Sequence, residues 1–255
     1  MILRKLLLKV LTIKYSQAKK MGRIFVTPSQ GGELTTPLIR RWTMIWPGEE
    51  KAWNILADLN ARAVAINAKA IFNSYDSTYL LKCFGQDISI SLRDRAISSA
   101  SKAGNFLVND LGDYSRLSIL RYLIHAKKLP FSGQLVRPAD LPGGDIFVKG
   151  SHILPLERAS SYFSNCNDEF LNVGKSLGGT QHHYGDISLT IFPFPQVPVV
   201  LILWLGDEEF PSNLSLLLDS SCASFLPPDI IWSISMMSIA MMLMDSGKRQ
   251  GGDEV

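Results

Sequence analysis

The chain contains 255 residues, of which 46% are apolar and 19% are charged, a composition typical of a globular protein with one well-buried core. Its longest apolar runs, at 197–205 and 230–244, are shorter than the roughly 18 to 20 residues that a membrane-spanning helix needs, so we expect a soluble protein without a transmembrane segment. Cys83, Cys166 and Cys222 stand far apart, which excludes a disulfide framework or a metal site recognisable from cysteine spacing and favours free thiols in the cytoplasm.

Positive charge is concentrated near the N-terminus. Residues 1–50 hold nine Lys or Arg against three Glu, a net charge of +6 that leaves the other 205 residues at 3 − 6 = −3. We expect residues 1–45 to be a basic extension, either disordered or upstream of a translation start at Met21 or Met44, or alternatively an amphipathic helix that contacts a membrane surface or nucleic acid. We expect residues 46–247 to form the single main domain, and 248–255 a disordered tail. The slightly negative charge of the domain does not favour nucleic-acid binding.

The first patterned segment, residues 49–72, predicts one amphipathic helix, because its apolar side chains recur at three- and four-residue spacing. The expected buried stripe consists of Trp53, Leu56, Leu59, Ala63 and Ile66. Residues 77–97 then predict two short strands joined at Gly85–Gln86, in which Ile88 and Ile90 alternate with serines. A hairpin is therefore expected after the first helix.

Residues 113–130 predict a second helix that ends before Pro130. Its expected apolar stripe consists of Leu117, Leu120, Leu123 and Ile124. Residues 131–157 are rich in glycine and proline and predict short extended pieces around a turn at 142–144. Helical patterning returns at 156–177, where the following Gly178–Gly179 pair is typical of a helix C-cap.

The C-terminal part predicts a sheet and a last helix. Apolar and polar residues alternate at 186–194, which predicts a half-exposed strand, whereas 197–205 is apolar throughout and predicts a strand buried on both faces. Residues 214–219 predict a third strand, and Pro228 begins a helix. The chain as a whole predicts an α+β fold, with an antiparallel or mixed sheet of short strands packed by about four helices in a single main domain.

Three stretches carry a resemblance to a known family: "SILRYLIHAKKLPFSGQLVRPADLPGG", "LGGTQHHYGDISLTIFPFPQVPVVLILWLGDEEFP" and "LLLDSSCASFLPPD". In this order they resemble the prokaryotic family catalogued as domain of unknown function 3786, over roughly residues 50–245. The resemblance implies a setting in anaerobic bacteria and archaea, where some members are joined to a cysteine-rich iron–sulfur domain. This chain has no cysteine cluster, so the resemblance does not imply that it binds an iron–sulfur cluster itself.

The densest polar set lies in "GGTQHHYGD" and "GDEEF". If 186–194 and 197–205 form an antiparallel hairpin around Pro195–Gln196, Asp186 and Asp207 come out at the same edge of the sheet. A histidine beside two or three carboxylates could bind a divalent ion or act as a general acid and base. The candidate site residues are His182, His183, Asp186, Asp207, Glu208 and Glu209.

A structural role is the competing interpretation of this set. Gly-Asp at a strand end is a common turn, and exposed Glu pairs are usually solvated. In this interpretation the carboxylates end a buried strand by drawing it into water, while Phe210 and Pro211 fold back as an apolar lid.

Two functions follow from these alternatives. The favoured one is a non-catalytic binding or accessory module, which the resemblance associates with iron–sulfur or corrinoid proteins of anaerobic metabolism. The alternative is a small metal-dependent or acid/base enzyme that uses the His and carboxylate loops. The spacing of a phosphate-binding loop and of a hydrolase elbow is absent, and the sequence specifies no cofactor. A protein partner or a small ligand is compatible with either function.

Overall fold

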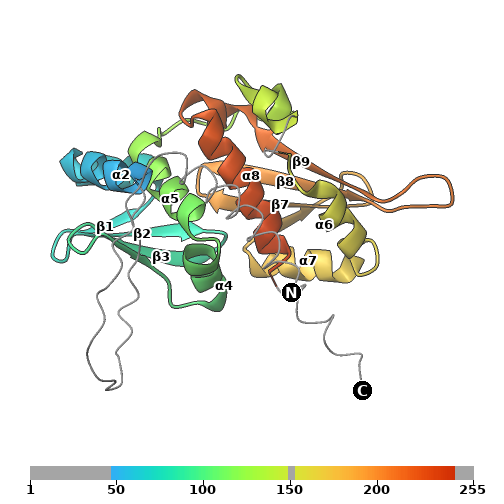
Figure 1. Ribbon diagram of the computed structural model, residues 1–255, viewed down its shortest axis with the longest axis horizontal. Helices are drawn as coiled ribbons and strands as arrows, with labels where there is room; N and C mark the ends of the chain where they lie inside the picture. Colours follow the sequence, from blue (N-terminus) through green and yellow to red (C-terminus); the bar gives the residue numbers. More distant parts are fainter. Residues whose placement is uncertain (1–46, 149–152, 245–255) are drawn as a thin grey trace, which may run out of the picture. The chain divides into compact units, whose positions relative to one another are not determined.

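The computed structural model describes residues 47–148 and 153–244, all of which belong to one compact unit, Ile45–Met244. The predicted basic extension 1–45 and the predicted tail 248–255 lie outside the described residues. The described residues form seven α-helices and two antiparallel sheets, which confirms the α+β fold (Figure 1). The strands are divided between two sheets rather than gathered in one. No helix among the residues described has the length and apolar character needed to cross a bilayer.

The segment predicted as one helix forms two helices, α2 Pro47–Asp58 and α3 Ala61–Ala68, followed by a strand. The break occurs because the side chain of Asn60 accepts the N–H of Ala63 and caps a new helix. Trp53 and Leu56 are buried as predicted, but Leu59 and Ile66 are exposed. The predicted stripe was therefore wrong beyond residue 58, since the break changes which face of the helix meets the core.

The first sheet is an antiparallel meander in which each strand pairs with the next. Its strands are β1 Ile71–Asn73, β2 Thr78–Cys83, β3 Gln86–Ser91 and β4 Ala96–Ser98. Ile88 and Ile90 are buried and alternate with half-exposed serines, as predicted. The two-residue turn between β2 and β3 is Phe84–Gly85, one residue earlier than predicted, and both residues have positive φ, as a tight hairpin turn requires.

The predicted second helix is confirmed as α5 Asp113–His125, preceded by the short α4 Lys102–Asn105 and a π-helical turn at Phe106–Asp110. Leu120 and Leu123 are buried, but Leu117 and Ile124 are only half-buried. Helix α5 packs on α2, and between the two helices the buried Arg116 donates to Oε1 of Glu49 at 2.7 and 3.1 Å. This buried ion pair links two helices that are separated in sequence by the first sheet.

The predicted helical stretch at 156–177 is interrupted, forming α6 Leu156–Phe163 and α7 Asn167–Ser176. The predicted C-cap is confirmed: Gly178 has φ 72°, and the N–H groups of Gly178 and Gly179 bond to the carbonyls of Lys175 and Gly174. These two bonds form a Schellman motif. Before α6, the glycine- and proline-rich segment contains β5 Leu135–Val136 and two 3-10 helices, Pro138–Asp140 and Gly144–Val148.

The second sheet has the order β5-β9-β8-β7-β6. Its longer strands are β7 Ile187–Phe194, β8 Val197–Trp204 and β9 Asn213–Asp219, and β6 is Thr180–His182. The prediction that β7 is half-exposed was wrong, because Ser188 and Thr190 are buried where β7 contacts α7, α8 and β2. The last helix, α8 Pro228–Met242, begins at Pro228 as predicted and contacts α5, α7 and β7.

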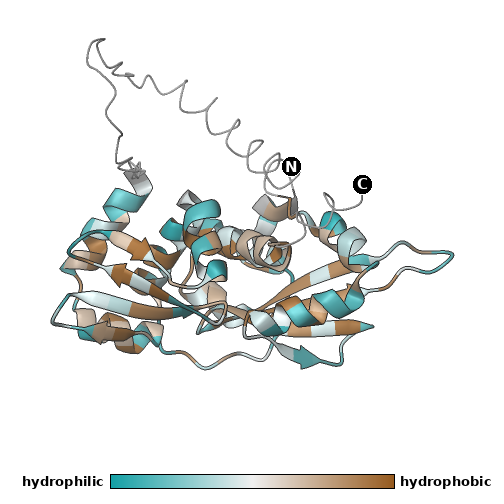
Figure 2. Ribbon diagram, turned by 90° about the horizontal axis from the view of Figure 1, so that it is seen from below, coloured by the Kyte–Doolittle hydropathy of each residue, from teal (hydrophilic) through white to brown (hydrophobic). Residues whose placement is uncertain are grey.

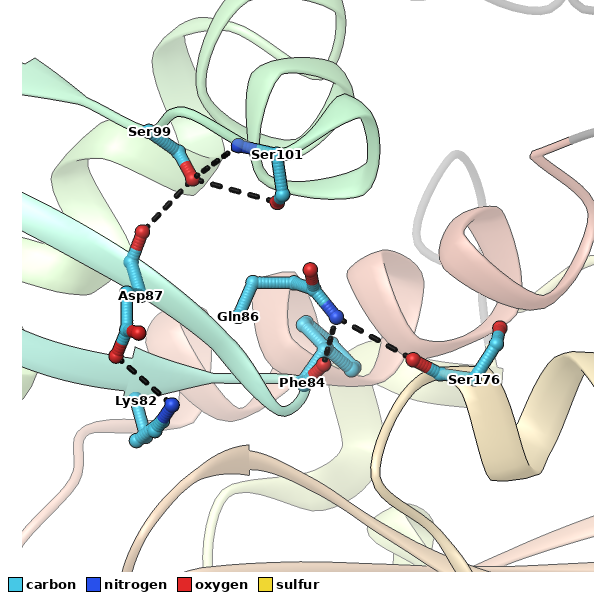
Figure 3. Close-up of polar contacts among 7 residues, drawn as sticks. All are labelled: Lys82, Phe84, Gln86, Asp87, Ser99, Ser101 and Ser176. Carbon is cyan, nitrogen blue, oxygen red and sulfur yellow. Dashed lines mark hydrogen bonds and ion pairs between the residues drawn. The ribbon is translucent and has the colours of Figure 1, made fainter.

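The tip of the β2–β3 hairpin joins the two sheets. A bulge in β7 between Ile191 and Phe194 leaves the Phe192 carbonyl to accept the N–H of Phe84 at 2.8 Å. Nearby, the Gln86 side chain donates to the Phe84 and Ser176 carbonyls (Figure 3). A Cβ at Gly85 would lie 3.1 Å from Gly178 N, and Gly85 has a φ of 71°, so both the tight contact and the backbone conformation favour glycine here.

Candidate functional site

The candidate residues lie at the end of the second sheet where β7 begins and β8 ends. β7 and β8 form the predicted hairpin around Pro195–Gln196, with Ile187 opposite Leu203. Asp186 therefore lies beside the end of β8, and Asp207 follows that strand in the β8–β9 connection. Figure 1 shows this connection projecting away from the helices (orange, right), and Figure 2 shows that much of it is hydrophilic. The predicted hairpin thus brings both aspartates to one end of the sheet.

Asp186 closes the end of the hairpin. Its Oδ2 accepts the backbone N–H of Leu205 at 2.8 Å, the first residue after β8. The carboxylate satisfies a backbone donor that the last sheet pair leaves free. Its side chain is otherwise exposed to solvent.

Asp207 closes its own turn. Its Oδ1 accepts the N–H groups of Phe210 at 2.7 Å and Glu209 at 2.9 Å, and its N–H donates to the Phe210 carbonyl at 2.9 Å. The backbone hydrogen bonds from Phe210 and then Glu209 lower the pKa of Asp207 from its usual value. Asp207 is therefore a charged, exposed turn residue of the Asx type.

The two histidines differ in their environment. His182 is half-buried on β6 opposite Ser188, and its ring lies 5.7 Å from that of Tyr184. His183, Glu208 and Glu209 are exposed. In the part of the chain that the structure describes, no group of three or more His, Cys, Asp or Glu side chains is arranged to hold a metal ion. A metal or acid/base role for the six candidate residues stays a prediction.

Apolar side chains accompany these polar groups. Tyr184 is 48% exposed, Trp204 45% and Phe210 67%, and Leu205 is also exposed. The predictions that Trp204 and Leu205 are buried and that Phe210 folds back as a lid were wrong. The Trp204 ring lies 3.2 Å from the position that a Cβ on Gly185 would take, so the ring packs against the backbone at Gly185. We call the group of Tyr184, Trp204, Leu205 and Phe210, with Asp186, Asp207, Glu208 and Glu209, the strand-end surface.

The length of the apolar run at 197–205 did not reveal in the sequence that its end is part of an exposed surface. The run from Val197 to Leu205 has no polar residue to mark where burial stops, and β8 becomes exposed only at its last residue, Trp204, which still pairs with Asn213. A signal was nevertheless present, because no Lys or Arg occurs between Lys175 and Lys248. A segment that contains Asp, Glu and aromatic residues but no Lys or Arg is a candidate for a negatively charged binding surface.

The family described as Domain of unknown function (DUF3786) matches residues 60–241. The chain belongs to this family. The DUF3786 match includes the whole strand-end surface, both sheets and most of α8. No curated protein and no solved structure matches the chain.

Two stretches that carry the DUF3786 resemblance, "FSGQLV" and "LLLD", meet at Asp219. This carboxylate is only 3% exposed. It accepts the N–H and hydroxyl of Ser132, the N–H of Gly133 at 2.8 Å, and the N–H and hydroxyl of Ser221. We call these four residues the Asp219 clasp. Sequence reasoning did not single out this clasp, because its two parts lie more than eighty residues apart.

The hydrogen bonds of the clasp determine the charge state of Asp219. Burial alone would raise its pKa, but the bonds from Ser221 and Ser132 outweigh burial and lower the pKa from 3.8 to about 2. Each donor is satisfied by the carboxylate, so the clasp fixes the 131–134 segment to the end of β9. Its contacts are those of a structural carboxylate.

Proposed function

We propose that this DUF3786 domain is a non-catalytic binding or accessory module that docks a protein partner on the strand-end surface. The observation that carries the proposal is that four exposed apolar residues, three of them aromatic, occur in the two segments that meet at one end of the second sheet. Exposed aromatic clusters with a polar rim are typical of protein-binding sites. The carboxylates of Asp186 and Asp207 hold backbone N–H groups of the same region, which favours a surface ordered before binding.

Comparative co-purification tests this proposal. The chain is isolated from cells in which it is native, as the wild type and as the variant Trp204→Ser/Phe210→Ser. Tyr75→Ser is the matched control, because Tyr75 is 91% exposed but lies in the β1–β2 turn, outside the strand-end surface. A partner that is retained by the control and lost by the double variant is expected. A partner set that is identical for all three proteins would contradict the proposal, provided that their melting temperatures agree.

The setting of the module is a second part of the proposal. The resemblance carried by the three sequence stretches is what supports a cytoplasmic role beside iron–sulfur or corrinoid proteins in anaerobic prokaryotes. The three cysteines are free thiols, two of them buried, as expected in a reducing compartment. Iron, sulfide and cobalt analysis of the co-purified partner tests this setting. A partner that contains no iron, sulfide or cobalt would contradict the proposed setting beside iron–sulfur or corrinoid proteins.

A metal-dependent or acid/base enzyme is the alternative, favoured by the placement of His182 and Asp186 at the same sheet end. If this alternative holds, a divalent ion that binds the folded state should raise the melting temperature of the wild type but not of Asp186→Asn. The binding-module proposal predicts no such difference with millimolar zinc, manganese, iron(II) or magnesium. An ion-specific rise that Asp186→Asn abolishes would replace the favoured function with the alternative.

A further inference from the structure

The strand-end surface carries charge of one sign. It contains four carboxylates, at positions 186, 207, 208 and 209, in the same two segments as its apolar side chains, and all four residues are exposed. The segment 176–247, which forms β6 to β9 and α8, supplies no Lys or Arg to neutralise them. The carboxylates of this segment therefore attract cationic groups and repel anionic ones.

The aromatic side chains add a second preference for cations. Lys and Arg are attracted to the faces of Trp, Tyr and Phe rings, and Arg also forms paired hydrogen bonds with carboxylates. Trp204 and Phe210 are among the most exposed aromatic residues of the domain, and each is within three residues of an exposed carboxylate along the chain. A Lys or Arg side chain could therefore meet a ring and a carboxylate together.

The turns hold this arrangement in place. Asp207 fixes the backbone of Glu209 and Phe210, and Asp186 fixes Leu205. A partner would not have to order these backbone segments on binding, which lowers the entropic cost of association. Nucleic acids and anionic membranes are disfavoured as ligands because their phosphates would approach four carboxylates.

We infer that the strand-end surface recognises a protein segment that carries Lys or Arg beside apolar side chains. The inference rests on the proposed function and names the chemistry of the partner. The apolar side chains of the segment would cover Leu205 and Phe210, while its cations would lie against the rings and the carboxylates of Glu208 and Glu209.

Peptide binding tests the inference on the full chain. The probe is a fluorescent 18-residue peptide of Lys and Leu at helical spacing, and its control is the peptide with Glu in place of Lys. Affinities are measured by fluorescence anisotropy at low and at high salt. Glu208→Gln/Glu209→Gln removes two charges from the surface, whereas Glu50→Gln/Asp76→Asn removes two exposed charges elsewhere.

The expected result is that the Lys/Leu peptide binds the wild type and that Glu208→Gln/Glu209→Gln weakens this binding about tenfold. The matched variant Glu50→Gln/Asp76→Asn should bind as the wild type does, and the Glu/Leu peptide should not bind. Equal loss in both variants, equal binding of both peptides or no binding of the Lys/Leu peptide would overturn the inference. A partner lost on Trp204→Ser/Phe210→Ser would still support the proposed function in those cases, so the two failures can be told apart.

Discussion

Asp219 at the end of β9 and Asp207 in the connection that precedes β9 both accept backbone N–H groups, but they differ in burial. Asp219 is 3% exposed and is surrounded by donors from two distant segments. Asp207 is exposed, and its hydrogen bonds among the described residues lie within its own turn. A carboxylate that is buried and fully bonded stabilises the fold, whereas one that holds only a local turn stays available to a partner.

The largest expected effect is at the Asp219 clasp. Asp219→Ala should lower the free energy of unfolding by about 3 kcal/mol, because it removes a buried carboxylate together with the hydrogen bonds that it accepts from Ser132, Gly133 and Ser221. Urea unfolding monitored by circular dichroism measures the change. A loss below about 1 kcal/mol would show that the clasp is not structural.

The pH dependence of the free energy of unfolding also tests whether the Asp219 carboxylate stabilises the fold. The pKa of Asp219 is about 2 in the folded state against 3.8 as its ordinary value, so the folded state favours the carboxylate. This preference contributes about 2 kcal/mol above about pH 4, and the contribution is lost as the pH falls from about 4 toward 2. The difference in unfolding free energy between the wild type and Asp219→Asn should shrink over that interval. A difference that stays constant with pH would contradict the lowered pKa.

Two buried tyrosines test whether hydrogen bonding, rather than burial alone, decides stability. The hydroxyl of Tyr122 donates to the Ala68 carbonyl at 3.0 Å, whereas that of Tyr79 has no partner among the described residues. Tyr122→Phe should cost about 1 kcal/mol, and Tyr79→Phe should leave the free energy of unfolding unchanged or raise it slightly. Equal losses measured by urea unfolding would mean that the two hydroxyls are equivalent.

The smallest effect is expected at the strand-end surface itself. Asp207→Asn and Asp186→Asn should each leave the melting temperature within about two degrees of the wild type, since exposed carboxylates contribute little to stability. Differential scanning calorimetry measures the shift. A much larger drop would place these aspartates with Asp219 as structural residues and would weaken the case for an available surface.

The sequence was most informative where local pattern decides the structure. The helix at 113–125, the glycine cap after α7 and the hairpin around Pro195–Gln196 all follow from side-chain periodicity or turn chemistry. Periodicity failed at Asn60, where a capping side chain breaks an otherwise continuous apolar stripe. It also failed at β7, because burial of Ser188 and Thr190 depends on elements distant in sequence.

The candidate site was only partly accessible from sequence for the same reason. The hairpin topology places Asp186 and Asp207 at one sheet end, which pattern alone could predict. The exposure of Trp204 and Phe210 could not be predicted, because an apolar run does not show where neighbouring strands stop. The Asp219 clasp joins segments that only the folded chain brings together.

Site-specific photo-crosslinking tests directly whether the strand-end surface is a docking site. A photoreactive phenylalanine analogue replaces Phe210 in one protein and Tyr75 in another, and both are irradiated in cells in which the chain is native. We expect a discrete adduct at position 210 that is absent at position 75, although Tyr75 is the more exposed of the two. Equal adducts at both positions, or none at position 210, would contradict docking at this surface.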